Sequence, residues 1–268
     1  MSETGIRWWH HLNRTQARDL VEEDPVAILP VAAVEQHGPH LPLSTDADIG
    51  HGLLEVAFRE LEGAVYALPM VRIGTSEEHG DVPGTLSLPA STLEDVVTGI
   101  GASLARAGVR RLVLSNSHGG NRAALDSAAL RLRREWSMLV VKANYFRFPR
   151  PDGLDLPEVE WEHGLHGGAV ETAMMLHLRP DLVEENAIAV FGSLGQDLES
   201  SLERLRPEGQ ASFAWLADDL NPHGVVGDAT LADAEMGERL LEHYGRILAD
   251  VVRDTALFPL GRLVDPHP

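Results

Sequence analysis

Val26-Ala-Ile-Leu-Pro-Val-Ala-Ala-Val34, followed at once by Glu35-Gln-His37-Gly38, is the stretch that decides the fold. Nearly every residue of the first run is apolar, which is typical of a strand covered on both faces of a parallel sheet. Two more runs of this kind follow along the chain, Arg111 to Ser115 and Met138 to Asn144. The first two runs lead directly into loops of glycine and polar residues. We therefore expect three strands of one mostly parallel sheet.

Helical patterns separate the predicted strands. They cover residues 47–61, 91–107, 122–136, 169–178 and 232–252, and the second opens with Ser91-Thr-Leu-Glu94, a candidate capping box. Strands that alternate with helices indicate the α/β class. We expect a three-layer α/β/α sandwich, built as a single domain over residues 1–268 with 259–268 as a loosely held tail. Residues 147–164 and 192–224 form two loops long enough to be lids.

The chain is acidic and contains no cysteine. Its formal net charge of −19 repels phosphate backbones and anionic bilayers, so we expect neither nucleic acid nor a membrane as a partner. Without cysteine there are no thiolate ligands, and any metal ion must be held by histidines and carboxylates. The N-terminus has no apolar signal core and no apolar run approaches the ~20 residues that cross a bilayer, which favours a cytoplasmic protein.

Four candidate metal ligands follow two of the predicted strands. Glu35 and His37 are two residues apart, so in an extended segment their side chains point the same way. Asp46 follows in the same loop, and His118 comes just after the second strand. Because ligands of open α/β sheets bind beyond the carboxyl ends of the strands, we expect these side chains to converge on Zn²⁺, Mn²⁺ or Fe²⁺. The alternative is that Glu35 and His37 are only a hydrogen-bonded pair within the loop.

A second dense segment runs from His163-Gly-Leu-His166-Gly-Gly to Glu171-Thr172. Its glycines permit close approach of the backbone to a ligand, and the ordinary pKa of a histidine, ~6.5, suits His166 to general acid or base catalysis. The alternative is a helix N-terminus with Glu171 in its first turn. A third segment, His79-Gly-Asp-Val-Pro-Gly84, by itself indicates only a turn.

Taken together, five motifs resemble the signature of the creatininase (creatinine amidohydrolase) family. They are Leu29-Pro30 with Glu35 to Pro42 and Thr45-Asp46, then His79 to Thr85, Asn116 to Asn121, His166 to Thr172, and Pro222-His-Gly224 with Gly227-Asp228. Each motif is short, but their order and spacing agree from about Ile28 to Leu241. The resemblance implies the same fold and a hydrolase that acts on C–N bonds other than ordinary peptide bonds.

The resemblance also implies roles for individual residues. Four of them fall on the positions that hold two metal ions in creatininase: Glu35, His37, Asp46 and His118. Asp46 falls on the position between the two ions, and His166 on that of the catalytic acid/base. Creatininase has a Glu where this chain has Gly120. Our candidate for the missing carboxylate is Glu171, a catalytic residue that is either a metal ligand itself or a partner that supports a ligand.

Further residues are candidates for contact with the substrate. Trp161 lies near the position of an aromatic flap residue, one residue further from His166 than in creatininase. His79 is a candidate substrate-binding side chain, and the backbone N–H groups of Gly119 and Gly167 are candidate donors to an oxyanion. The resemblance further implies two divalent ions per subunit and a homohexamer.

These observations lead to one hypothesis and its alternatives. We expect a metal-dependent amidohydrolase that uses metal-bound hydroxide and a histidine acid/base to open a C–N bond of a small cyclic or linear amide. Relatives with the His-Gly-Gly-Asn run found at His118 to Asn121 include formamidopyrimidine deformylases and the mycofactocin precursor peptidase. Deformylation and peptide cleavage are therefore alternatives at the same site. The alternative from another class is a non-catalytic module that binds a metal ion or a small molecule.

Overall fold

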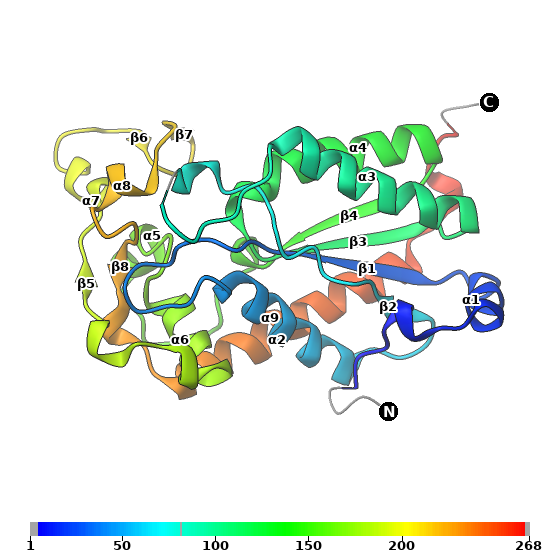
Figure 1. The fold of residues 1–268 in the computed structure, drawn as a ribbon, viewed down its shortest axis with the longest axis horizontal. Helices are drawn as coiled ribbons and strands as arrows, with labels where there is room; N and C mark the ends of the chain where they lie inside the picture. The colour runs from blue at the N-terminus through cyan, green and yellow to red at the C-terminus, as the bar shows by residue number, and fades with distance from the viewer. Residues whose placement is uncertain (1–4, 81, 266–268) are drawn as a thin grey trace.

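The computed structural model describes residues 5–80 and 82–265, and its centre is a four-stranded sheet (Figure 1). The strands lie in the order β2-β1-β3-β4, and every pair of neighbours is parallel. Their bounds are Val26–Val31 for β1, Val65–Ala67 for β2, Arg111–Asn116 for β3 and Leu139–Asn144 for β4. The predicted parallel sheet is confirmed, and β2 is an additional strand too short to be recognised from its sequence pattern.

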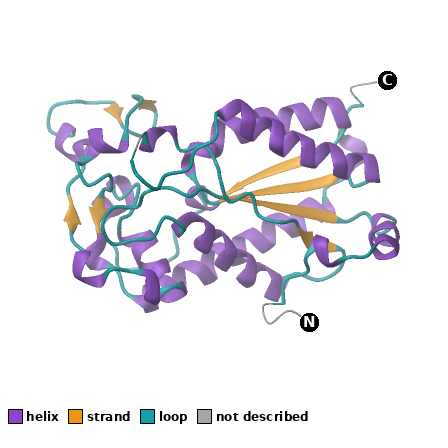
Figure 2. Ribbon diagram, in the orientation of Figure 1, coloured by secondary structure: helices purple, strands orange, loops and turns teal. Residues whose placement is uncertain are grey.

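Alternate side chains of β1 enter two separate hydrophobic cores. Val26 and Ile28 pack in one core with α2, α6 and α9. Ala27, Leu29 and Val31 pack in the other with α3 and α4. The helices are Thr45–Glu60 (α2), Ala169–Leu178 (α6) and Ala234–Leu257 (α9) on one face, and Ala90–Ala107 (α3) and Arg122–Trp136 (α4) on the other. Figure 2 shows the strands between these two layers of helices, which confirms the three-layer α/β/α sandwich.

Most predicted elements have bounds close to those observed. Helices α4 and α6 coincide with their predictions, whereas β1 ends at Val31, three residues early. Beyond that point the Ala32 N–H donates to the carbonyl of Val71 in a loop (2.9 Å). The capping box predicted at Ser91 is wrong, because α3 begins one residue earlier with Pro89 at its N-cap and no side-chain hydrogen bond.

A segment of short elements lies beyond the carboxyl ends of the sheet strands (Figure 1). Its elements are α5 (Glu158–His163), β5 (Val190–Phe191), α7 (Leu194–Leu198), β6 (Leu205–Arg206), β7 (Ala211–Ser212), α8 (Ala217–Leu220) and β8 (Gly227–Asp228). Strand β5 pairs with β8 in antiparallel orientation, and β6 pairs with β7 in parallel orientation. The two segments predicted as lid loops, 147–164 and 192–224, contribute most of these elements.

The remaining elements are one helix and several 3-10 turns. Helix α1 (Arg14–Val21) was not predicted, and its N-cap Asn13 accepts hydrogen bonds from two backbone N–H groups of the first turn. The 3-10 turns are Trp9–His11, Glu77–His79, Gly119–Asn121, Tyr145–Arg147, Pro180–Leu182, Glu185–Ala187, Ala229–Leu231 and Leu260–Arg262. Among the described residues, no helix combines the length and the apolar character needed to cross a bilayer.

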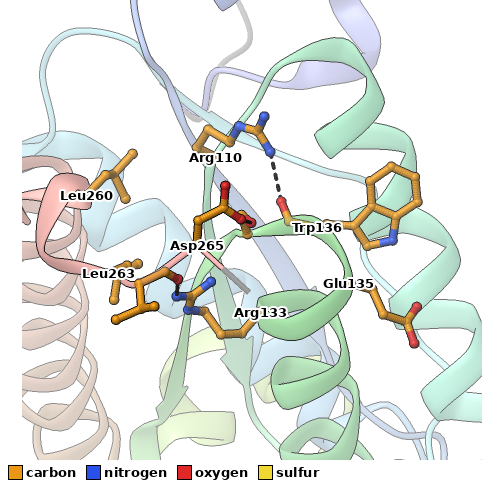
Figure 3. Close-up of a pocket in the computed structure, with 9 residues that line it drawn as sticks. Arg110, Arg133, Glu135, Trp136, Leu260, Leu263 and Asp265 are labelled. Atoms are coloured by element: carbon orange, nitrogen blue, oxygen red, sulfur yellow. Dashed lines mark hydrogen bonds between the residues drawn. The ribbon is translucent and has the colours of Figure 1, made fainter. Parts of the chain in front are cut away.

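The C-terminal tail lies at the end of the sheet where the strands begin. Figure 3 shows the residues that line a pocket there, among them Arg110, Trp136, Leu260, Leu263 and Asp265. The Arg110 guanidinium donates to the carbonyl of Trp136 (2.8 Å), and Arg133 donates to that of Val264. Of these two hydrogen bonds, the one from Arg133 is made with the tail that was predicted to be loosely held, and tail residues 266–268 lie outside the described part of the chain.

Gly237 lets α9 cross closely over α6. A Cβ at this position would collide with the main-chain carbonyl oxygen of Ala173. We expect Gly237→Ala to lower the free energy of unfolding by about 1–3 kcal/mol, because the two helices have to separate. In the matched control Gly99→Ala in α3, the new Cβ meets no atom within 4 Å, and we expect stability to rise by about 0.5–1 kcal/mol. Urea denaturation measures both changes, and equal effects would contradict the close crossing.

Candidate metal centre and active site

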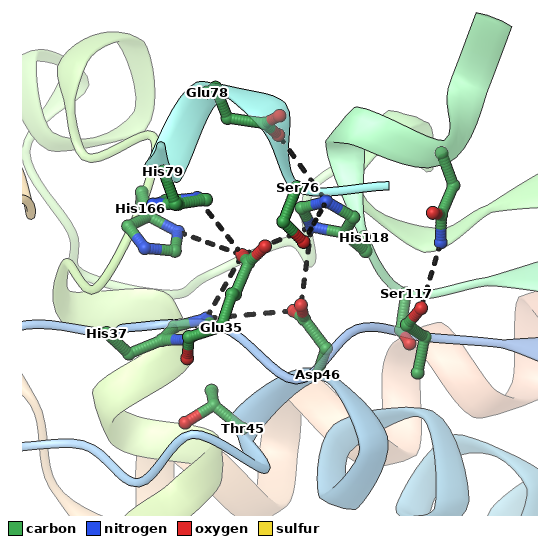
Figure 4. A network of polar contacts seen from close by, with 12 residues as sticks. Glu35, His37, Thr45, Asp46, Ser76, Glu78, His79, Ser117, His118 and His166 are labelled. Atoms are coloured by element: carbon green, nitrogen blue, oxygen red, sulfur yellow. Dashed lines mark hydrogen bonds and ion pairs between the residues drawn. The ribbon is translucent and has the colours of Figure 1, made fainter. Parts of the chain in front are cut away.

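Four buried side chains meet just beyond the carboxyl ends of β1 and β3 (Figure 4). Glu35 and His37 follow β1 along the chain. Asp46 lies in the first turn of α2, where the helix N-terminus favours negative charge, and His118 follows β3. No more than 4% of the surface of any of these residues is exposed. The side chains that the sequence predicted to converge at the edge of the sheet are therefore together.

The polar atoms of these residues lie close enough to share an ion. His118 Nδ1 is 3.2 Å from Glu35 Oε1 and 3.3 Å from Asp46 Oδ2. His37 Nε2 is 3.7 Å from Asp46 Oδ1 and 3.9 Å from Glu35 Oε1. Asp46 thus faces His118 with one oxygen and His37 with the other. A carboxylate in this position is suited to lie between two metal ions.

Several polar atoms of the cluster lack a hydrogen-bond partner within the described part of the chain. They are both carboxylate oxygens of Glu35, Asp46 Oδ2 and His37 Nε2. Buried polar atoms without partners are strongly disfavoured, and a bound cation would satisfy all four of them. Carboxylate oxygens and imidazole nitrogens suit Zn²⁺, Mn²⁺ and Fe²⁺. The residues present therefore fit a divalent metal centre, whereas a hydrogen-bonded loop pair alone leaves these atoms unexplained.

The outer ring nitrogens of His37 and His118 are held by backbone carbonyls. His37 Nδ1 donates to the carbonyl oxygen of Glu35 (3.1 Å), and His118 Nε2 donates to that of Thr75 (2.8 Å). Because a carbonyl oxygen only accepts hydrogen bonds, each neutral ring keeps its proton on the outer nitrogen. The inner nitrogen then presents a lone pair to the carboxylates, which is how metal-binding histidines are oriented.

In the metal-free protein the carboxylates draw protons onto the same two histidines. Burial disfavours the charged ring of His37, but Asp46, with Glu171 and Glu35, outweighs burial and raises the pKa of His37 to about 9. Burial is outweighed in the same way at His118, whose pKa lies well above its usual value because of Glu35 and Asp46. Burial also opposes the charge of Glu35, but His118 and His79 hold its pKa well below its usual range. The cluster therefore favours positive charge at its centre.

His166 approaches the cluster from the turn before α6. Its Nδ1 is 3.8 Å from Glu35 Oε1, and its Nε2 donates to the backbone carbonyl of Gln36 (2.9 Å). Burial, with the nearby rings of His37 and His79, lowers the pKa of His166 well below its usual value. A neutral His166 therefore presents the lone pair of Nδ1 to the cluster.

Glu171, in the first turn of α6, contacts the cluster beside His37. Its Oε2 is 3.9 Å from His37 Nε2 and accepts the backbone N–H of Gly167 (2.7 Å). Glu171, His37 and His166 form a second group whose ligand atoms lie within 4.8 Å of one another. The Gly167 N–H, a candidate oxyanion donor from the sequence, is already engaged by Glu171.

Glu78 is a carboxylate of the site that was not singled out from the sequence. Its Oε1 is 3.4 Å from His118 Nε2, and it fills the space beside Gly120, where an added Cβ would collide with it. His118 Nε2 is the nitrogen that points away from Asp46, so Glu78 lies on the outer side of the ring. Glu171 is the carboxylate beside His37. The only sequence signal for Glu78 was its place directly before His79.

The other predicted site residues differ in their distance from the cluster. His79 is buried, with Nε2 3.3 Å from Glu35 Oε1. Gly119 lies exposed in the 3-10 turn that follows His118. The half-buried ring of Trp161 packs against the hydrophobic core, 5.0 Å from the guanidinium carbon of Arg150. A contact of Trp161 with substrate stays a prediction.

A separate trio of possible ligands lies on α5 and next to α7. His163 Nε2 is 3.2 Å from Glu199 Oε1, and Glu162 is the third member. Both glutamates are exposed, and the Arg206 guanidinium lies 3.6 Å from Glu199 Oε1. The arginine already supplies positive charge to this trio, so the buried cluster around Glu35 is the better metal site.

A sequence model of the creatininase (creatinine amidohydrolase) family matches residues 10–252. The chain belongs to this family. The resemblance read from the five motifs is thereby confirmed, and with it a hydrolase that acts on C–N bonds. The fold of this chain is similar to that of solved creatininase structures. "Creatininase Mn" superimposes with a TM-score of 0.73 and 27% identity, over 93% of this chain and 98% of that chain.

Two relatives of this chain carry names for different activities. A mycofactocin precursor peptide peptidase of Mycolicibacterium smegmatis is 32% identical over 247 residues, which cover 90% of each chain. A creatinine amidohydrolase of Pseudomonas putida is 29% identical over 257 residues, which cover 86% of this chain and 90% of the relative. Creatininase-family relatives of similar identity thus carry names for different substrates.

Metal uptake by this creatininase-family chain is expected to release protons. In the metal-free protein His37 holds a proton up to a pKa of about 9, whereas a ligating imidazole has to be neutral. Zinc binding at neutral pH therefore displaces protons, and the affinity is expected to increase as the pH rises toward that pKa. Isothermal titration in buffers of different ionisation enthalpy measures the protons released. A binding heat independent of the buffer would contradict the assignment of His37.

Proposed function

We propose that this chain is a metal-dependent amidohydrolase that opens a C–N bond of a small cyclic or linear amide at the cluster around Glu35. The supporting observation is the set of buried, unpartnered ligand atoms in a chain of the creatininase family. One ion would be held by Glu35, Asp46 and His118, and a second by His37, Asp46 and Glu171. Zinc or manganese suits these donors. The name "Creatininase Mn" of the superimposed structure supports manganese.

The bound ions and the protein would have separate tasks. A divalent ion bound here would lower the pKa of a water molecule toward ~7 and would stabilise negative charge on the amide oxygen. Proton transfer would be carried out by the protein. His166 Nδ1 faces the cluster, where it would take up a proton and then give it to the departing nitrogen. The hydrogen bond from Nε2 to the Gln36 carbonyl holds the ring in the orientation that this transfer needs.

Removal of a ligand is expected to abolish both metal binding and turnover. Glu35→Gln and His118→Ala each remove a donor at the centre of the cluster, so elemental analysis of the purified variants should find the metal strongly depleted. Glu55→Gln, on the half-exposed side of α2, is the matched control and should keep the wild-type metal content. Full turnover by a metal-free Glu35→Gln variant would refute the proposed function.

Replacement of His166 is expected to separate metal binding from catalysis. His166→Gln should retain the metal bound by Glu35, Asp46 and His118 but lower kcat by about 10²–10⁴-fold, because the leaving nitrogen loses its proton donor. His177→Gln, at an exposed position of α6, is the control and should leave kcat unchanged. Elemental analysis and steady-state kinetics measure the two effects. Unchanged kcat in His166→Gln would contradict the role of His166 as proton donor, whereas a wild-type protein that binds metal but turns over no amide would favour a non-catalytic binding module.

The identity of the substrate is tested by a panel of amides. A small cyclic amide such as creatinine, a formamidopyrimidine and short peptides would be assayed with the metal-loaded protein. The peptidase name of the 32%-identical relative makes peptide cleavage the second candidate function. Turnover of peptides alone would select that candidate, while turnover of the cyclic amide supports the proposal as stated.

The resemblance to creatininase also supports proposals about assembly and location. We propose a homohexamer, located in the cytoplasm, with two ions in each subunit. Light scattering coupled to size-exclusion chromatography measures the mass of the assembly, and elemental analysis measures the ions per chain. A monomer in solution would contradict the first part of this proposal.

A further inference from the structure

His79 differs from the other three histidines of the cluster in what its outer nitrogen contacts. The outer nitrogens of His37, His118 and His166 each face a backbone carbonyl oxygen. The outer nitrogen of His79, Nδ1, faces the side-chain amide nitrogen of Gln36 instead (2.8 Å). A carbonyl oxygen only accepts hydrogen bonds, whereas an amide NH₂ group only donates them. The outer nitrogen of His79 therefore accepts a hydrogen bond, whereas the outer nitrogens of the other three histidines donate one.

The orientation of the Gln36 amide is fixed by two backbone groups. Its Oε1 accepts the N–H of Gly38 (2.9 Å), and its Nε2 donates to the carbonyl of Gly224 (2.6 Å). Exchanging the oxygen and nitrogen would break both hydrogen bonds. The second hydrogen of Nε2 consequently points to His79 Nδ1, which has to accept it. The proton of His79 then lies on Nε2, 3.3 Å from Glu35 Oε1.

We infer that Gln36 and His79 form a positioning relay, in which Gln36 fixes the proton of His79 on Nε2 and that N–H is directed at Glu35 Oε1 across 3.3 Å. His79 thereby turns an N–H, and not a lone pair, toward the metal centre and is not one of its ligands. His37, His118 and His166 present lone pairs to the same centre. Gln36 therefore gives His79 the opposite tautomer to the other three histidines of the cluster. The inference rests on the proposed function, since Glu35 is one of the proposed metal ligands.

The relay gives a role to the late motif Pro222-His-Gly224, which the proposed reaction leaves unexplained. Gly224 has a φ of +70°, and a Cβ there would lie 2.6–2.8 Å from the amide atoms of Gln36. Only glycine both adopts this backbone conformation without strain and lets its carbonyl reach the Gln36 amide. Gly224 lies 188 residues after Gln36 in the sequence. Its motif thus influences Glu35 through the side chains of Gln36 and His79.

The proton on His79 is observable directly by ¹⁵N NMR of histidine-labelled protein, both metal-free and loaded with zinc. We expect Nε2 of His79 to show the shift of a protonated ring nitrogen and Nδ1 that of an acceptor. His79→Gln, which lacks the signal, identifies it in the spectrum. A proton on Nδ1, or a zinc-bound Nε2, would overturn the inference. The metal-free spectrum decides the question even if the protein binds no zinc.

Gln36→Glu tests the relay through metal affinity. The carboxylate has the same shape but no hydrogen to donate, so the proton of His79 moves to Nδ1 and Nε2 turns a lone pair toward Glu35. We expect zinc affinity, measured by competition with a chromophoric chelator, to fall by about 10- to 100-fold, as for other partners of metal ligands. Gln16→Glu, an equal change of charge on the exposed side of α1, is the control.

Gly224→Ala disturbs the hydrogen bond between Gln36 and His79 without changing either residue. Its Cβ displaces the Gln36 amide without altering any histidine or carboxylate of the cluster. Gly63→Ala has the same backbone strain, with a φ of +73° and no atom within 4 Å of its Cβ, and is the matched control. We expect zinc affinity to fall in Gly224→Ala but not in Gly63→Ala.

The outcomes separate the relay from the proposed function. Wild-type zinc affinity in Gln36→Glu and Gly224→Ala, with both proteins folded by circular dichroism, would overturn the relay and leave the metal centre intact. Absence of zinc binding in the wild-type protein would instead contradict the proposed function.

Discussion

Glu35 presents two carboxylate oxygens to the interior of the protein, neither exposed to water nor hydrogen-bonded to the described residues around it. Placing such a charge in the interior costs several kcal/mol unless a partner of opposite charge compensates it. His37, His79, His118 and His166 surround the carboxylate within 3.9 Å (Figure 4). The need to compensate this buried charge explains the chemistry of the site: protons on His37 and His118 without metal, and a divalent cation in their place.

The sheet brings these groups together because its strands are parallel. Strands β1 and β3 are neighbours in register, so their carboxyl ends deliver Glu35 and His118 to the same edge. Helices α2 and α6 begin at this edge and add Asp46 and Glu171 in their first turns. The two hydrophobic cores cover both faces of the sheet, so the polar side chains of the site lie at its rim. The site is thus a direct consequence of the α/β/α arrangement.

The main strands and the central ligands could be predicted from the sequence because the ligands directly follow the strands along the chain. The apolar runs of β1 and β3 are long enough to be recognised, and Glu35, His37 and His118 follow them directly. Strand β2 has three residues and gives no periodic signal. Gln36 was part of a quoted motif, yet its role depends on His79 and Gly224, which lie 43 and 188 residues away. Contacts over such separations are set by the fold and leave no local pattern.

The resemblance to creatininase supplied what the residues alone left open. From the residues alone, the preferred interpretation of His166 and Glu171 was an ordinary helix N-terminus, and it was the family motif that assigned them to a site. Glu78, which fills the space beside Gly120, was missed because its carboxylate reaches His118 only in the folded chain. Formamidopyrimidine deformylation stays a prediction from the resemblance.

Anomalous X-ray diffraction at the zinc edge, from crystals of zinc-loaded protein, tests the central claim most directly. The account predicts a peak bound by Glu35, Asp46 and His118 at coordination distances of about 2.0–2.3 Å, with a second peak beside His37. Zinc bound only elsewhere, for example at Glu162, His163 and Glu199, with no anomalous density beside Glu35, would contradict it.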